Sequence, residues 1–210
     1  GRDFGVILAC LAKEGYSVEW RVVNAAQYGA AQRRRRTFIF AYRNDTIYGQ
    51  KMADISADMI IKNGGLMAKA FPIQNMGRIT ETVIGGDIVD VSDNFAFAFE
   101  TAGYMCKGRI YTAKVTEQEE EPITLGKILQ KNVDDKFYIT NEKMPKWTYL
   151  KGAKKIPRKS ADGHEYMFSE GPIAFPDPWD RPGRTMLTSE STLNRSTHVV
   201  SDPGTGRLRL

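Results

Sequence analysis

Residues 24–43 read NAAQYGAAQRRRRTFIFAYR, and the organisation of the surrounding chain follows from this stretch. Four consecutive arginines, Arg33 to Arg36, run into an apolar segment over 37–42 that predicts a β-strand. Side chains of an extended chain alternate between two faces, so Arg34 and Arg36 are expected to share one face and the other two arginines the opposite one. Two guanidinium groups side by side suit a phosphate or the carbonyl edge of a base. A solvated charge run on an edge strand would give the same pattern.

The composition is that of a globular chain with a positive balance. At 210 residues and 23.6 kDa, the chain can form one substantial core, or one domain and part of another. The net charge of +5 permits binding to nucleic acid without demanding it. No apolar run approaches the ~20 residues that a bilayer-spanning helix needs. We therefore expect no membrane partner.

Cysteine and histidine usage argues against a metal site. Cys10 and Cys106 have neither metal-ligand spacing nor a disulfide framework, which favours a reducing cytoplasm. His164 and His198 have no partner at useful spacing. The chain begins without methionine and ends in Arg-Leu-Arg-Leu, so a fragment of a longer protein is expected.

The first 45 residues predict a helix followed by two strands. Asp3 is the expected cap of a helix over 4–14, and alternation over 16–23 predicts a strand. With the segment 37–42, these elements fit the trailing edge of an α/β sheet.

The pattern changes after Arg43 to short β candidates. Residues 87–91 alternate like a strand, and Lys107-Gly108 predicts a tight hairpin.

A basic region over 141–159 is the next distinctive feature. It holds seven lysines and arginines against one acid, with Trp147 and Tyr149 interleaved. Basic groups with aromatic neighbours suit contact with a phosphate backbone, although a solvated basic helix would look similar. The expected DNA-facing residues here are Lys151, Lys154, Lys155, Arg158 and Lys159.

The arginine block resembles a signature of the DNA cytosine-5 methyltransferases. That signature has the form Asn/Asp-Ala, Tyr-Gly and Gln-x-Arg-x-Arg before a strand, and here Gln32, Arg34 and Arg36 occupy its fixed positions. Residues 1–20 resemble the stretch after the family's Glu-Asn-Val motif. Residues 184–190 and 194–200 resemble its late block, in the bacterial and phage branch.

The resemblance implies a mixed α+β fold. A helix and a two-strand remnant of a Rossmann-like methyltransferase sheet are expected to join an irregular, β-rich target-recognition domain. The implied ranges are 1–45 for the edge of the catalytic domain, 46–182 for target recognition and 183–210 for a return segment packing between the two.

The resemblance also implies roles for individual residues. Arg36 would donate to the carbonyl of a flipped cytosine in double-stranded DNA, Arg34 would hold the base, phosphate or catalytic acid, and Gln32 would brace the loop. Arg184 and Thr185, in the late block, are further expected DNA contacts. S-adenosyl-L-methionine would be the methyl donor.

The chain lacks the family's Pro-Cys nucleophile, its Glu-Asn-Val motif and its Phe-x-Gly-x-Gly cofactor loop. We therefore expect these 210 residues to be inactive alone.

Other interpretations remain open from the sequence. The chain could be a non-catalytic DNA-binding module derived from a methyltransferase, or part of an RNA cytosine methyltransferase; a basic RNA-binding protein fits less well, since no RNA-recognition signature is present. A cognate restriction endonuclease is a candidate partner, and a homodimer would cover apolar faces of a truncated sheet.

Overall fold

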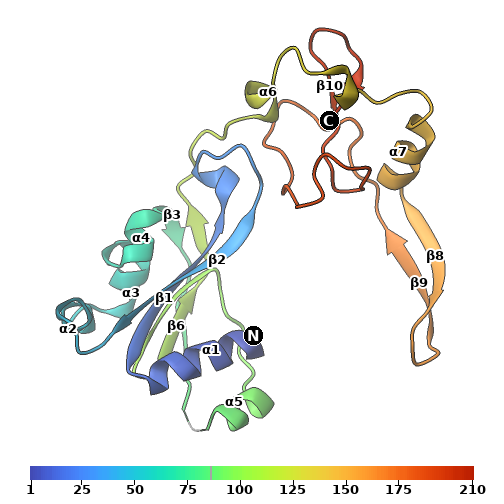
Figure 1. Cartoon of the computed structure of the whole chain (residues 1–210). Coiled ribbons are helices and arrows are strands. Elements are labelled where there is room, and N and C mark those ends of the chain that lie inside the picture. Colours follow the sequence, from blue (N-terminus) through green and yellow to red (C-terminus); the bar gives the residue numbers. More distant parts are fainter. Residues whose placement is uncertain (86) are drawn as a thin grey trace. The chain divides into compact units, whose positions relative to one another are not determined.

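The computed structural model describes residues 1–85 and 87–210 and divides them into two compact units (Figure 1). Unit 1 comprises Gly1–Tyr28 and Arg35–Glu121, and unit 2 comprises Gly29–Arg34 and Pro122–Leu210. These units differ from the ranges 1–45, 46–182 and 183–210 expected from the sequence. The chain leaves unit 1 just before the arginine block and re-enters it within that block.

Unit 1 is built on an antiparallel sheet whose five strands, among the described residues, are ordered β2-β1-β5-β6-β4. The two strands expected from the sequence are therefore part of a larger sheet, because β1 also pairs with β5 from the range assigned to target recognition. A separate pair joins β3 to β7. The strands are β1 (Tyr16–Asn24), β2 (Arg35–Arg43), β3 (Ile73–Met76), β4 (Thr80–Val83), β5 (Ala102–Cys106), β6 (Arg109–Ala113) and β7 (Val115–Glu117).

Helices cover both faces of this sheet (Figure 1). Leu8 of α1 packs with Val18, Trp20 and Met105 on one face, while Met52 and Ile60 pack on the other. The helices are α1 (Arg2–Lys13), α2 (Ile47–Ala53), α3 (Ala57–Met59), a π-helical turn (Ile60–Gly64), α4 (Leu66–Ala70) and α5 (Ile88–Asn94).

Strand β1 is buried along its centre, and its two charged residues at the centre lie on one side. Glu19 and Arg21 point toward α4, opposite the face that carries Trp20. Glu19 Oε2 accepts a hydrogen bond of 2.9 Å from the amide of Met67, in the first turn of α4. Arg21 donates to the carbonyls of Ile61, at 2.8 Å, and Phe71, at 3.0 Å. Both ends of this irregular helical segment therefore bond to one strand.

Two local predictions in unit 1 were wrong. Asp3 does not cap α1, because the helix begins at Arg2 and Asp3 lies within its first turn. Residues 87–91 are not a strand: Asp87 is the N-cap of α5, and the other four form its first half. In a strand Val89 and Val91 would share a face, but Val89 is exposed whereas Val91 is buried against the cluster around Leu8. The helix, the two strands and the Lys107-Gly108 hairpin were predicted correctly.

Unit 2 has little regular structure and a small apolar core of Ile139, Trp147 and Val199. A buried ion pair joins Arg209 Nε to Asp202 Oδ2 at 2.7 Å. Within the part of the chain that the structure describes, no helix of either unit has the length and apolar character to cross a membrane. The elements of unit 2 are α6 (Leu125–Ile128), a 3₁₀ turn (Asp135–Phe137), α7 (Met144–Lys151), β8 (Lys154–Lys159), β9 (Glu165–Glu170), β10 (Val200–Ser201) and β11 (Leu208–Arg209).

Lys151 is the last residue of α7 and is buried in unit 2. Its Nζ donates to the carbonyl of Thr197, and it lies 5.6 Å from the centre of the Trp147 ring. Burial, followed by the positive charges of Arg184 and Arg195, lowers the pKa of Lys151 from 10.5 to about 8. This lysine is part of the interior of unit 2.

Replacing Gly103 with alanine should destabilise unit 1. Gly103 lies opposite Trp20 in the β1–β5 ladder, and an added Cβ would lie 1.9 Å from the indole Cζ2. Because Trp20 is buried between Phe4 and Phe99, the ring has no room to move. We expect a loss of about 2 kcal/mol or more in the free energy of unfolding, measured by urea denaturation. Gly85→Ala, which meets nothing within 4 Å, should change it by less than about 0.5 kcal/mol. Equal effects would contradict the packing described.

Lys151 should make stability depend on pH. The unfolded chain holds this proton up to about pH 10.5 and the folded chain releases it near pH 8, so stability should rise with pH between these values. The slope contributed is at most about 1.4 kcal/mol per pH unit. Urea unfolding from pH 7 to 10 should show this rise in the wild-type chain and in Lys131→Met, an exposed control. Lys151→Met should lose it, and an unchanged slope would refute the pKa assignment.

Candidate nucleic-acid interface

The start of the arginine block, up to Arg34, and the return segment lie side by side in unit 2 although about 150 residues separate them in the chain. The backbone on either side of Gln32 pairs with that of Gly183 in a parallel bridge. The amide of Arg33 donates to the carbonyl of Gly183 at 2.9 Å, and the amide of Gly183 donates to the carbonyl of Ala31 at 2.8 Å. The two stretches that carried the family resemblance therefore form one seam, which we call the 31–34/183–186 seam.

Side chains complete this seam. Gln32 Oε1 accepts a hydrogen bond of 3.2 Å from the amide of Met186. Thr185 Oγ donates to the carbonyl of Arg33 at 2.7 Å. Arg34 reaches the carbonyl of Met186 at 3.5 Å and is half-buried. Gln32 and Thr185 thus hold backbone positions, and Arg34 keeps most of its donors free.

Arg36 is the second residue of the edge strand β2 and belongs to unit 1. Strand β2 begins at Arg35, and Arg36 stands opposite Val23 of β1. Its side chain is exposed and donates to the carbonyl of Arg35, at 2.7 Å. The expectation that Arg34 and Arg36 share a strand face is not met, because Arg34 precedes the strand. Within its own unit, neither guanidinium forms an ion pair with a carboxylate of the described residues.

The expected DNA-facing lysines divide into two groups. Lys151 is buried, and Lys154 donates to the carbonyl of Leu150 at 3.0 Å and to Glu170 at 3.3 Å. Their charges are therefore used inside unit 2, which corrects the expectation that the whole run faces outward. Lys155, Arg158 and Lys159 are exposed on β8.

Arg184 is anchored rather than free. Its Nε and Nη2 donate to the two carboxylate oxygens of Asp177 at 2.7 and 3.1 Å, and further bonds reach the carbonyls of Ser196 and Thr197. Burial alone would raise the pKa of Asp177, but the hydrogen bonds from Arg184 and from the Val199 amide leave it lowered. This bidentate pair orients the return segment, so the expected DNA contact of Arg184 does not follow from its geometry.

Sequence reasoning also missed an acid of the return segment. Glu190 accepts from the amide of His198 at 2.6 Å, and its other oxygen lies 3.2 Å from His198 Nδ1. The other ring nitrogen, Nε2, is buried and has no hydrogen-bond partner in the part of the chain described. His198 therefore does have an acidic partner, contrary to the expectation from spacing. The pair lies in an irregular loop, where residue spacing gives no signal of proximity.

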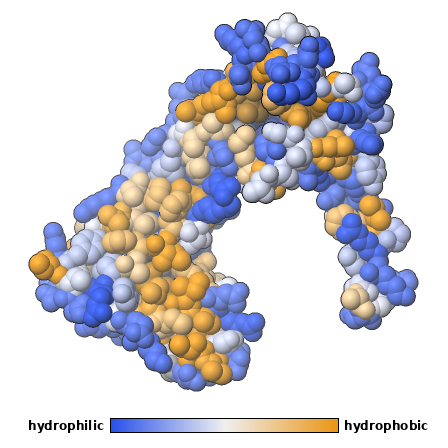
Figure 2. Space-filling view, in the orientation of Figure 1, coloured by the Kyte–Doolittle hydropathy of each residue, from blue (hydrophilic) through white to orange (hydrophobic). Residues whose placement is uncertain are grey.

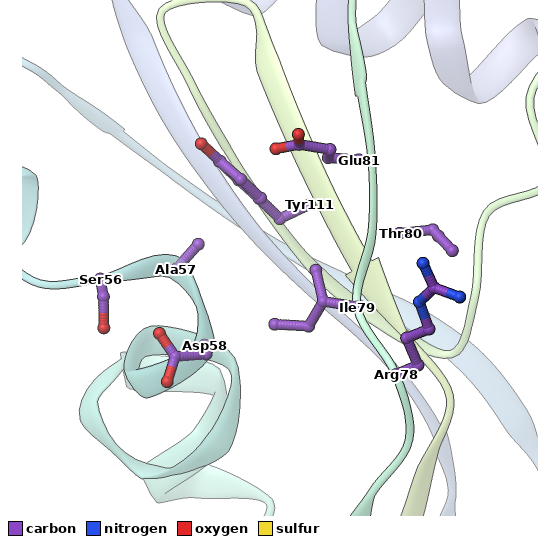
Figure 3. A pocket seen from close by; sticks show the side chains of 8 residues that line it. All are labelled: Ser56, Ala57, Asp58, Arg78, Ile79, Thr80, Glu81 and Tyr111. Atoms are coloured by element: carbon purple, nitrogen blue, oxygen red, sulfur yellow. The ribbon is translucent and has the colours of Figure 1, made fainter.

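A surface depression of about 720 Å³ lies in unit 1 between α3 and the β4–β6 ladder (Figure 3). Asp58 and Arg78 lie on opposite sides of it, and Glu81 stands beside Tyr111. A nucleoside cofactor such as S-adenosylmethionine needs an enclosed and largely apolar slot for its base. The depression is open, and Ile79 and Tyr111 are the main apolar groups of its wall. These residues do not fit that cofactor.

Comparison with known proteins identifies the family. The model for C-5 cytosine-specific DNA methylases matches residues 1–199. The type II methyltransferase M.Sau3AI of Staphylococcus aureus is 50% identical over 210 residues, which are 99% of this chain and 51% of that protein. A second relative, the type II methyltransferase M.Sau96I of the same species, is 39% identical over 51 residues, 24% of this chain and 12% of its own length. The chain thus spans about half the length of M.Sau3AI. No solved structure matches. This chain belongs to the C-5 cytosine-specific DNA methylase family.

Proposed function

We propose that the chain is the part of a DNA (cytosine-5-)-methyltransferase that carries the active-site arginines and recognises the target. The 31–34/183–186 seam is the observation that most supports this proposal, because it brings together the two stretches whose sequences resemble blocks of the methyltransferase family. S-adenosyl-L-methionine would supply the methyl group, and the residues that bind it are proposed to lie elsewhere in the parent protein.

The chemistry of cytosine explains why arginines are needed. C5 of cytosine is a poor nucleophile until a thiolate adds to C6, and the base must leave the duplex to be reached. Negative charge develops on the ring as the thiolate adds. Arg36, exposed and without an acidic partner among the described residues of its unit, is the proposed donor to the base carbonyl, and Arg34 is the proposed contact to the base or its phosphate.

Target recognition is proposed to lie within 122–182, in unit 2. Lys155, Arg158 and Lys159 are its proposed DNA contacts, since they are the exposed cations of β8. Double-stranded DNA is the proposed substrate.

Two protein partners are also proposed. M.Sau3AI is a type II methyltransferase, and by analogy a cognate restriction endonuclease is the first proposed partner. A second copy of the chain is the other, supported by Phe38 and Ile39, which are exposed on the edge strand β2. Figure 2 shows apolar side chains gathered over this face of unit 1. Light scattering that gives a monomer mass at high concentration would refute the homodimer.

Arg36→Ala should separate catalysis from binding. In the intact methyltransferase we expect turnover to fall roughly a hundredfold or more, because a donor to the developing charge is lost. Affinity for duplex DNA should change by less than about threefold. Methyl transfer from labelled S-adenosylmethionine and fluorescence anisotropy measure the two quantities.

Arg35→Ala is the matched control, since Arg35 is adjacent on β2 and its side chain takes the opposite face. It should leave turnover within about threefold of wild type. Equal losses of turnover and affinity in Arg36→Ala would overturn the catalytic assignment. The 210-residue chain alone should transfer no methyl group in the same assay.

A further inference from the structure

Strands β8 and β9 form a two-stranded ribbon that extends away from the loops of unit 2 (Figure 1). Among the described residues, each strand pairs only with the other, in register from Lys154 opposite Glu170 to Lys159 opposite Glu165. The outer half is exposed on both faces. A two-stranded hairpin is marginally stable by itself, so its position must be fixed from its base.

The base of the ribbon is fixed by charged groups. Arg195 donates to the carbonyls of Leu150, at 2.7 Å, and Gly152, at 3.1 Å, at the end of α7, and also to the carbonyl of Gly171 just after β9. Lys154 bonds to the same Leu150 carbonyl and to Glu170. These contacts join both strands to α7. The ribbon is therefore held at a defined angle within unit 2 while its outer half stays free.

Arg158 is the cation that the outer half presents in a fixed orientation. Its guanidinium carbon lies 3.8 Å from the centre of the Phe168 ring, the diagonal neighbour on the same face. Stacking of this kind restricts the guanidinium plane and leaves its N–H donors at the edge. In the described chain Arg158 has no hydrogen-bond or carboxylate partner. An exposed arginine held in this way can donate two parallel N–H bonds to a pair of acceptors that lie in one plane.

Lys155 and Lys159 project from the opposite face of β8. Lys159 lies 4.0 Å from Glu165, and the Asp162 carboxylate accepts a hydrogen bond from the Ser160 hydroxyl in the turn. The lysines are long and exposed, which suits contact with phosphates rather than with bases.

The major groove of B-form DNA admits a two-stranded β-ribbon, and an arginine fork matches O6 and N7 of guanine there. We propose that β8–β9 enters the major groove and that Arg158 is a specificity-determining residue that reads a guanine; this inference rests on the proposed DNA-binding function. Lys155 and Lys159 hold the flanking phosphates. The deep, narrow major groove of an RNA duplex excludes the same ribbon.

The test uses the 210-residue chain and duplexes selected from a pool with a randomised window. The wild-type chain should select a sequence with guanine at one position. Arg158→Lys keeps the charge but loses the fork, so preference at that one position should fall about tenfold or more. Affinity for unrelated duplexes should stay within about twofold. Lys155→Gln should instead weaken all duplexes alike and lower the salt slope by roughly one.

Arg207→Lys is the matched control, because Arg207 is also exposed and stacked, 4.2 Å from the Tyr138 ring, but lies outside the ribbon. It should leave the preference unchanged, and thermal unfolding should show all variants folded. An unaltered preference in Arg158→Lys, or a wild-type chain that binds duplexes without preference, would overturn the role of Arg158 and leave DNA binding intact. Equal binding of a duplex RNA would overturn the major-groove assignment. No binding of duplex DNA by the wild-type chain would overturn the proposed function itself.

Discussion

The contacts that Glu19 and Arg21 make from strand β1 are the constraint on which unit 1 depends. Burial raises the pKa of Glu19, although the amides of Met67 and Leu66 lower it, and burial lowers the pKa of Arg21. Such groups are tolerated inside a protein only when their hydrogen bonds are made. Here the bonds fall on the start of α4 and on carbonyls of the preceding and following turns, while Glu19 Oε1 and Arg21 Nε have no partner among the described residues. They hold an irregular helical segment against the sheet, and with it β1, whose partner β2 carries Arg36.

Sequence patterns predicted what is local and failed where tertiary packing decides. The apolar residues of α1, and those of β1 that pack against it, recur at the spacing of their own element, so both elements could be predicted from the sequence. Residues 87–91 alternate in type, but packing against Leu8 selects Val91 and leaves Val89 exposed, which only the fold determines. Strands β5 and β6 are adjacent in the chain, so the turn between them predicted their pairing. The sequence did not predict the pairing of β5 with β1, because about 80 residues separate these two strands.

The basic run over 141–159 shows why charge alone does not locate a binding surface. Lys151 and Lys154 belong to the same basic run as the exposed Lys155, yet one is buried against Thr197 and the other donates to a carbonyl at the end of α7. Lysine stems are long enough to serve interior carbonyls, so a run of like residues can carry both structural and surface charges. The roles of Asp177 and Glu190 were missed for a different reason. Their partners, Arg184 and His198, are brought to them by irregular loops, which sequence spacing does not predict.

The 31–34/183–186 seam closes the chain between its two sides into a ring of about 150 residues. The entropy lost on closing a flexible ring grows only with the logarithm of its length, about 0.6 kcal/mol for each doubling. Lengthening or shortening a loop inside this ring therefore costs the seam little. The segment between β7 and Gly183 could be replaced by a longer or shorter one while the arginines at the seam kept their pairing with the return segment.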